Sequence, residues 1–198
     1  VNIGASKFSL TDDVDSDKYI SVASQYFPGY IEPSISSEQE ESILKVTFQT
    51  DSPKKVFRFW ENRSPNFDIV LGNTNLETNL DIVLGAGEGT VTLSNLNVLN
   101  LNSKVGAGEL KISLMDIAIP TKMTLDIGAG SLVLDVPENV GYTLTYDLGI
   151  GEISSNNEEI ASFAGKGTNY KSSNFDTSEK KIEIVAKVGV GSLVINNI

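Results

Sequence analysis

The chain has 198 residues, and its 26 acidic side chains outnumber its 15 lysines and arginines, which gives a net charge of −11. It contains no cysteine, which excludes disulfides, thiol catalysis and cysteine-ligated zinc, and no histidine, the commonest general base and transition-metal ligand. An acidic surface repels phosphate groups, so neither nucleic acid nor an anionic lipid surface is expected as a partner.

The start of the sequence carries no targeting or membrane-spanning pattern. Val1 is not a methionine, and no signal-peptide pattern follows it. No apolar run reaches the roughly 18 residues that a transmembrane helix needs. We therefore expect that a signal peptide or a membrane anchor precedes Val1, with the chain itself lying outside the cytoplasm.

Residues 1–65 show short, irregular strand patterns. Alternating apolar residues predict strands here and just beyond: Tyr19–Ala23, Ile43–Phe48, Lys55–Trp60 and Phe67–Leu71. Residues 27–30 (Phe-Pro-Gly-Tyr) predict a turn, and Ser36–Ser42 predicts an acidic, polar loop. Because the last turn of a β-stack must protect an open edge, residues 1–65 are interpreted as irregular capping turns.

Two clusters in this first part are candidate binding sites. Asp12, Asp13, Asp15 and Asp17 offer several carboxylates for calcium, but the glycine and the distal glutamate of an EF-hand loop are missing. A solvated acidic loop is the favoured interpretation. Arg58, Trp60 and Arg63 form a tentative binding patch for a sugar or an anionic polymer, with core packing of the aromatic residues as the alternative.

A repeat dominates residues 66–198. Five Gly-x-Gly tripeptides recur: Gly85-Ala86-Gly87, Gly106-Ala107-Gly108, Gly128-Ala129-Gly130, Gly149-Ile150-Gly151 and Gly189-Val190-Gly191. The first four are spaced by 21, 22 and 21 residues, and the last gap of 40 residues is close to two repeats. The turn inside that gap is expected to have an altered corner near Gly165-Lys166-Gly167, with a protruding polar loop at Asn169–Lys181.

Apolar residues alternate on both sides of each tripeptide, and the parity changes at the glycines. Leu84 and Ala86, for example, are followed by Val91 and Leu93. A change of parity indicates that the strand contains one extra residue, as in a β-bulge. The extra residue bends the strand while the same face of the strand stays inward. Glycine tolerates the backbone conformation of such a bend. The pattern predicts an all-β, single-domain β-solenoid over residues 1–198, with turns of roughly 21 residues cornered at Gly-x-Gly.

In a solenoid, equivalent residues of successive turns stack in columns. One expected column consists of Leu84, Val105, Ile127, Leu148 and Val188. An antiparallel β-sandwich is the alternative, but it predicts Asn-Gly or Asp-Gly hairpin turns every 8–12 residues, and the sequence has neither dipeptide. The open ends of a solenoid carry unpaired strand edges, so homo-oligomers through these ends are possible.

The repeat offers no obvious chemistry. Glu88, Glu109 and Glu152 follow successive corners, where Ser131 and Ser192 take the equivalent positions. Stacked carboxylates could bind a cation or act as acid and base, but a charged, solvated face is favoured because serine interrupts the row. The glycines are not followed by a helix, as a dinucleotide site requires. No cofactor and no metal are therefore expected.

The region from Trp60 to Ile198 resembles the toast-rack family of bacterial envelope proteins and the extracytoplasmic C-terminal domain of LiaF-type antibiotic-response proteins. The resemblance rests on four segments: Asn79–Gly87, Leu125–Leu134, Val136–Gly141 and Val188–Leu193. It implies a β-helix-like stack of short strands at the cell surface or in envelope-stress signalling. It implies no enzyme and supplies no functional residues.

Three functions remain open at this point. The favoured one is a non-catalytic extracytoplasmic module, membrane-anchored or at the cell surface, that binds a protein partner and regulates the envelope stress response. A structural, adhesin-like surface protein is the second. A polysaccharide-active enzyme is the third, and it would gain support if Lys104, Lys111 and Lys122 converged beside Glu109 in a groove.

Overall fold

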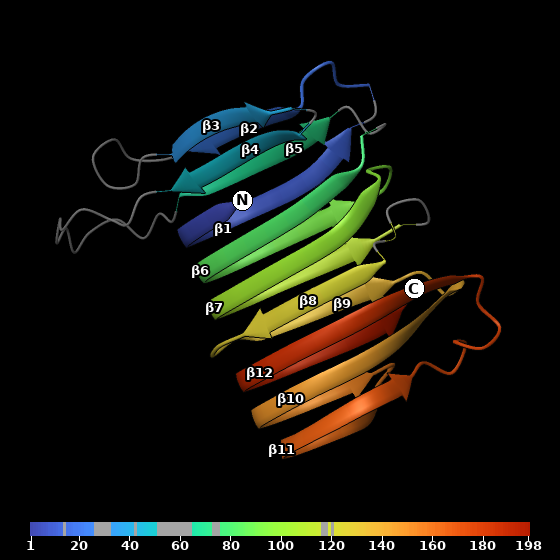
Figure 1. The fold of residues 1–198 in the computed structure, drawn as a ribbon. Helices are drawn as coiled ribbons and strands as arrows, with labels where there is room; N and C mark the ends of the chain where they lie inside the picture. The colour runs from blue at the N-terminus through green and yellow to red at the C-terminus, as the bar shows by residue number, and fades with distance from the viewer. Residues whose placement is uncertain are drawn as a thin grey trace, which may run out of the picture.

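The structure, a computed structural model, describes residues 1–13, 15–25, 33–41, 43–50, 65–72, 76–115, 119 and 121–198. All regular secondary structure in these residues is β (Figure 1). The strands are β1 (Asn2–Asp13), β2 (Ile20–Gln25), β3 (Pro33–Glu40), β4 (Ile43–Thr50), β5 (Asn66–Gly72), β6 (Thr78–Leu93), β7 (Val98–Leu114), β8 (Lys122–Ile127), β9 (Ser131–Val136), β10 (Val140–Ser155), β11 (Glu158–Lys171) and β12 (Lys180–Asn197).

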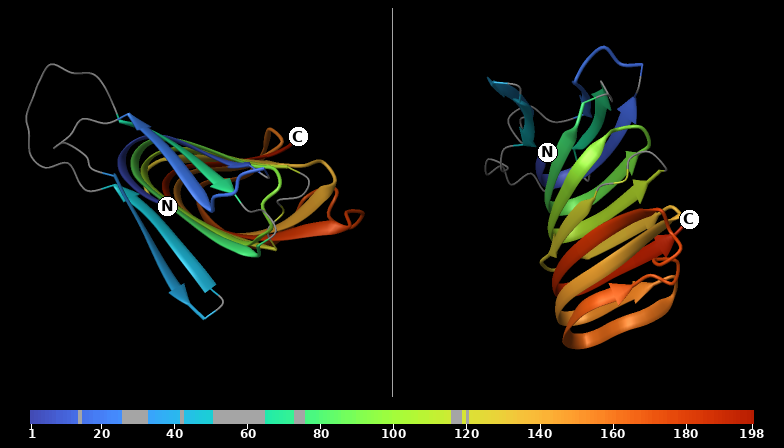
Figure 2. Two further views of the ribbon diagram at one scale, coloured as in Figure 1. Left: turned by 90° about the horizontal axis from the view of Figure 1, so that it is seen from above. Right: turned by 45° about the vertical axis from the view of Figure 1, so that its right-hand side comes forward.

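Each long strand forms one bent turn of a stack. β6 and β7 pair in parallel along their length, from Leu80↔Leu101 to Leu93↔Leu114. Seen from above, the bent strands form a flattened loop whose two arms face each other, with the connecting loops opposite the bend (Figure 2, left). The Gly-x-Gly tripeptides lie at the bend, so the predicted all-β solenoid is confirmed.

The order of the turns in space differs from their order in the sequence. The strands follow one another as β11-β10-β12-β8-β7-β6-β1-β4-β3. β12 therefore lies between β8/β9 on one side and β10 on the other (Figure 1). The expected column of Leu84, Val105, Ile127, Leu148 and Val188 is confirmed by the strand register. Its order in space differs from the order in the sequence, because Val188 lies between Ile127 and Leu148.

β1 forms a complete turn at the other side of the regular stack. It pairs in parallel with β6 from Asn2↔Val83 to Thr11↔Thr92, which places Gly4-Ala5-Ser6 against the corner Gly85-Ala86-Gly87. The regular turns therefore include β1, whereas the sequence predicted only irregular caps in residues 1–65. The repeat pattern did not predict a corner at Gly4-Ala5-Ser6, because serine replaces the second glycine there.

Antiparallel pairs close both ends of the parallel stack. β2 pairs with β5 and β3 with β4 at one end, and β10 pairs with β11 at the other. β2, β4 and β5 agree with the predicted strands. The loop predicted at Ser36–Ser42 is wrong, because residues up to Glu40 belong to β3, which pairs with β4 through backbone hydrogen bonds that its polar side chains do not impede. The strand predicted at Lys55–Trp60 and the turn at 27–30 lie outside the described residues.

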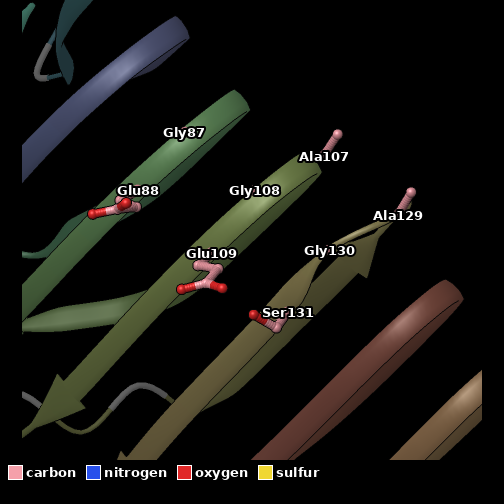
Figure 3. A pocket seen from close by; sticks show the side chains of 8 residues that line it. All are labelled: Gly87, Glu88, Ala107, Gly108, Glu109, Ala129, Gly130 and Ser131. Carbon is pink, nitrogen blue, oxygen red and sulfur yellow. The ribbon is translucent and has the colours of Figure 1, made fainter. Parts of the chain in front are cut away.

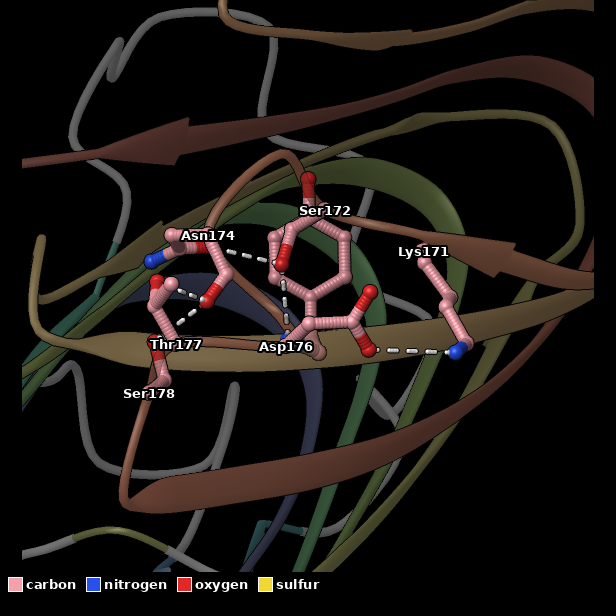
Figure 4. A network of polar contacts seen from close by, with 7 residues as sticks. Lys171, Ser172, Asn174, Asp176, Thr177 and Ser178 are labelled. Carbon is pink, nitrogen blue, oxygen red and sulfur yellow. Dashed lines mark hydrogen bonds and ion pairs between the residues drawn. The ribbon is translucent and has the colours of Figure 1, made fainter.

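The altered turn predicted in the gap of 40 residues is β11, and its loop is shorter than expected. Strand pairing continues to Lys171, and β12 already starts at Lys180, so only residues 172–179 form the loop. Asn174 organises this loop (Figure 4): its Nδ2 donates to the carbonyl oxygens of Glu138 (2.8 Å) and Val140 (3.0 Å), and its own carbonyl accepts from Ser178 Oγ. The loop returns the chain from the end of the stack to its interior.

The inward residues of both arms form one continuous core. Inward residues such as Leu84, Ile127 and Ile184 are fully buried. The middle residues of the corners do not belong to this core, although the alternation through Leu84 and Ala86 suggested it. Ile150 is 64% exposed and Val190 55% exposed, because the bend turns their side chains outward. The described part of the chain includes no helix long and apolar enough to span a membrane.

Candidate functional site: the corner surface

The corner is a place where backbones of neighbouring turns touch. A Cβ atom added to Gly108 would lie 2.5 Å from the carbonyl oxygen of Gly87, and one added to Gly85 would lie 2.6 Å from that of Gly4. Such distances leave room for hydrogen only, which is why glycine recurs here. All ten glycines named in the sequence lie at these bends. The corner is consequently almost bare of side chains.

A shallow groove of about 520 Å³ runs along this bare edge across three turns (Figure 3). Its floor is backbone, and the side chains at its border are small or acidic. The lining residues are Gly87, Glu88, Ala107, Gly108, Glu109, Ala129, Gly130 and Ser131. In Figure 3, Ala107 and Ala129 point away from the bends, while Glu88, Glu109 and Ser131 form a row on the other side.

Strand register extends this row beyond the groove. Lys7 lies beside Glu88, and Glu109 lies between Glu88 and Ser131. Lys7 Nζ is 2.7 Å from Glu88 Oε2, so the charge of Glu88 is neutralised within the row. Ser192 and Glu152 complete it in space. No group of three acidic side chains that could hold a metal ion occurs in the described residues.

An apolar strip continues the corner toward β11. Val190 and Ile150 are register partners, and Phe163 of β11 lies opposite Gly151, the residue after Ile150. These three side chains are 55%, 64% and 81% exposed. We call Val190, Ile150 and Phe163 the apolar strip. Sequence reasoning missed it, although the change from alanine to isoleucine and valine at the middle of the last two corners was a visible signal.

The lysines that would support an enzyme do not converge beside Glu109. Lys104 Nζ lies 3.8 Å from Asp126, Lys111 Nζ lies 2.9 Å from Asp135, and Lys122 Nζ lies 3.5 Å from Glu183. Each lysine thus pairs with a different carboxylate on the outer faces of the arms.

The acidic run near the N-terminus has a structural role at one position. The carboxylate of Asp12 accepts hydrogen bonds from the backbone N–H groups of Ser94 (2.7 Å), Asn95 and Leu96 (2.8 Å). Asp12 therefore lies at the end of β1 and holds the loop after β6, instead of belonging to a solvated loop. Arg58, Trp60 and Arg63, the tentative binding patch, lie outside the described residues.

Comparisons with known proteins agree with the fold. The model of the family described as the N-terminal domain of toast_rack, DUF2154, matches residues 1–135. No curated protein matches the chain. A crystal structure from Clostridium sporogenes ATCC 15579, provisionally described as a cell adhesion protein, is similar with a TM-score of 0.73 and 22% identity, covering 100% of this chain and 91% of the other.

A second solved structure, provisionally described as an adhesin from Bacteroides fragilis NCTC 9343, is more distant. Its TM-score is 0.34 and its identity 15%, over 98% of this chain and 90% of the other. The likeness to the Clostridium sporogenes structure supports the fold, and the second is too weak to add to it.

Proposed function

Since this chain belongs to the family of the N-terminal domain of toast_rack, we propose that it is a non-catalytic, extracytoplasmic module that binds another protein through its corner surface. In this proposal the partner is a membrane protein of the cell envelope, such as a sensor kinase, and the module regulates its response to envelope stress.

The observation that carries the proposal is the exposure of the apolar strip. Phe163 is 81% exposed, more than any other large apolar side chain in the described residues. It lies opposite Gly151, the residue after exposed Ile150, and exposed Val190 is the register partner of Ile150. Adjacent exposed apolar residues on a soluble surface are typical of protein–protein interaction sites. Aromatic side chains such as that of Phe163 often supply much of the binding energy in such sites.

Charges around the strip favour a protein over other partners. Lys166 Nζ lies 2.8 Å from Asp147 on the turn that contributes Ile150, so this pair is internally neutral. Glu152 and Glu159 add negative charge nearby, and the chain as a whole carries −11. An anionic polymer or lipid surface would be repelled, whereas an apolar pocket with a neutral or basic rim would fit.

The proposal includes no catalysis, and two observations support that. The sequence has no histidine and no cysteine. Two carboxylates line the groove, but Glu88 is already paired with Lys7, and no group of acidic side chains among the described residues could hold a metal ion. General acid–base catalysis by carboxylates needs a partner group within reach of the same substrate.

Adhesion is a second candidate, supported by the provisional description of the Clostridium sporogenes protein as a cell adhesion protein. In that case the same corner surface would bind a component outside the cell. The two candidates differ in the partner and not in the surface that binds it.

A photo-cross-linking experiment tests the proposal. A photoreactive amino acid at Ile150, on the exposed strip, should capture a protein from the native envelope fraction, identified by mass spectrometry. The same amino acid at Thr124, on the outer face of β8, is the control. With the photoreactive amino acid kept at position 150, the double variant Val190→Ser and Phe163→Ser should lose capture with an unchanged melting temperature.

Recovery of a membrane protein from Ile150 alone would support the regulatory module. Recovery of surface material from outside the cell would support adhesion. Equal capture from positions 150 and 124, or capture that survives the double variant, would rule out the corner surface as the binding site.

A further inference from the structure

The β3–β4 hairpin projects from its end of the stack. β4 contacts the neighbouring turn at a single register pair, Asn2↔Gln49, and only its last residues, including Phe48 and Thr50, are buried. Seven of the eight residues of β3 are exposed. Figure 2 shows the hairpin extending beyond the flattened loop of the other strands. Within the part of the chain that the structure describes, the far half of the hairpin therefore has no sheet behind it.

The outer edge of β3 is regular and open. β3 and β4 pair without a register shift from Pro33↔Thr50 to Glu40↔Ile43, and in the described residues no strand pairs with the other edge of β3. A straight strand leaves alternate N–H and C=O groups pointing outward, available to another strand.

The opposite end of the stack is built differently. β11 is also an edge strand, but its pairing with β10 has three register shifts. Phe163 and Asn169 in β11 adopt φ values of 67° and 59°, in the left-handed region. Such bulges twist an edge and block pairing with another strand. Among the described residues, the end of the stack formed by β2 and β3 has no such bulges.

An isolated two-stranded hairpin is marginally stable, and a third strand with an apolar face is needed for stable order. On one face of this hairpin, Ile35 is 52% exposed and Leu44 is 37% exposed, in line with buried Phe48. A strand paired beside β3 would extend this face and place further side chains next to Ile35.

We propose that β3 pairs antiparallel with β3 of a second copy of this chain, which creates a four-stranded sheet in the order β4-β3-β3-β4. The sequence of β3 suits pairing with itself. In a register centred on Ser37, Glu38 lies opposite Ser36 of the second copy, and Glu40 lies opposite Ser34. The apolar faces of both hairpins then lie on the same side of the sheet, because residues of equal parity face each other.

No carboxylate faces another in this arrangement. In a parallel, in-register pair, by contrast, Glu38 and Glu40 would lie beside their own copies, which is unfavourable. The absence of directly opposed carboxylates therefore favours the antiparallel homodimer. It buries neither the groove nor the apolar strip, since these lie along the bend and toward β11.

Sedimentation equilibrium of the wild-type chain tests the dimer. We expect a reversible monomer–dimer equilibrium at micromolar to millimolar concentration. Ser36→Glu places a carboxylate against Glu38 twice in each dimer and should weaken dimerisation about tenfold, whereas Ser36→Lys should strengthen it. Thr47→Glu adds the same charge on β4, across the hairpin from Ser36, and should have little effect.

A cross-link provides the second measurement, because the chain has no cysteine of its own. Under mild oxidation Ser37→Cys should form a disulfide-linked dimer, since directly opposed residues of an antiparallel pair lie within disulfide range. Ser162→Cys, exposed on the β11 edge, is the control.

A wild-type chain that remains monomeric over the whole concentration range would overturn the proposal, and so would cross-linking of Ser162→Cys that equals or exceeds that of Ser37→Cys. Binding of a strand from another protein to β3, with no self-association, would overturn it as well. Circular dichroism spectra and melting temperatures show whether each variant is folded. The double variant Val190→Ser and Phe163→Ser should dimerise normally, so that this proposal and the proposed function fail independently.

Discussion

Lys187 of β12 lies in register with Asp126 of β8, although 61 positions separate them in the sequence (187 − 126). On its other side, Lys187 is in register with Asp147 of β10. If β10 followed β8 directly, as in a simple solenoid, the two aspartates at these positions would be neighbours. The inserted strand places a lysine between them, so the charge pattern favours the observed order of turns.

Lys187→Glu should destabilise the fold because it creates three adjacent carboxylates. Two like-charged cross-strand pairs replace two favourable ones, so we expect a loss of about 1 kcal/mol, reduced by salt. The measurement is the free energy of unfolding in urea at low and high ionic strength. Lys18→Glu, in the loop between β1 and β2, makes the same change in net charge and should have almost no effect.

Gly191→Ala should be among the most destabilising single-methyl additions in the chain. Gly191 has a φ of 154°, and an added Cβ atom would overlap the carbonyl oxygen of Gly130. We expect a loss of about 3 kcal/mol or more, measured by thermal or urea unfolding. For Gly165→Ala, no atom lies within 4 Å of the added Cβ, so stability should be unchanged or slightly higher. Equal losses in both variants would contradict the stacking at the corner.

Ser103→Ala should stabilise the protein. Ser103 is 3% exposed and stands between Ile82 and Leu125 in a core column, and its Oγ has no hydrogen-bond partner in the structure. Removing an unsatisfied buried hydroxyl should add about 1 kcal/mol to the free energy of unfolding. Ser113→Ala is the matched comparison, since Ser113 Oγ donates to Asp135 Oδ2 at 3.0 Å. Ser113→Ala should lower the free energy of unfolding by a similar amount.

Asp135 should make stability depend on acid pH. Burial alone would raise the pKa of this carboxyl, but hydrogen bonds from Lys111, Asn196 and Ser113 and the charge of Lys111 outweigh it, so the pKa lies below its ordinary value of 3.8. A pKa lower in the folded than in the unfolded state stabilises the fold above pH 3.8, and this contribution is lost as the pH falls through the folded-state pKa.

Asp135→Asn removes this dependence. At neutral pH the variant should be about 2 kcal/mol less stable than the wild type, because Lys111 loses its partner at 2.9 Å. The difference between the two proteins should shrink as the pH is lowered below 3.8. Urea unfolding at a series of pH values measures it, and a constant difference would show that Asp135 contributes only packing.

The sequence predicted the bent, stacked turns because that information is local. The glycine spacing and the alternation on either side of Gly106 or Gly128 depend on neighbouring residues alone. The insertion of β12 between β8 and β10 depends on contacts between residues far apart in the sequence, such as Lys187 and Asp126. Such pairs can be recognised only when the order of the strands in space is known. No local sequence pattern shows whether a turn stacks on the turn that precedes it in the sequence or is inserted elsewhere in the stack.

The candidate site was predicted only in part, for a related reason. The groove follows from the corner glycines, which the repeat revealed. The apolar strip depends on which way the middle residue of each corner points, and alternation alone placed Ile150 with the inward residues. Phe163 joins the strip through antiparallel pairing with Gly151, across a bulge that leaves no clear pattern in the sequence.

The insertion of β1 and β12 also limits how a stack of this kind can change its length during evolution. In an ordinary solenoid, duplication of the first or last repeat of a gene adds a turn at the corresponding end. Here the strands at the two ends in space, β3 and β11, are not the first and last strands in the sequence. A duplicated copy of β12 would have to enter the interior between two existing turns. Gain or loss of whole repeats is therefore easiest between β6 and β8, where sequence order and spatial order coincide.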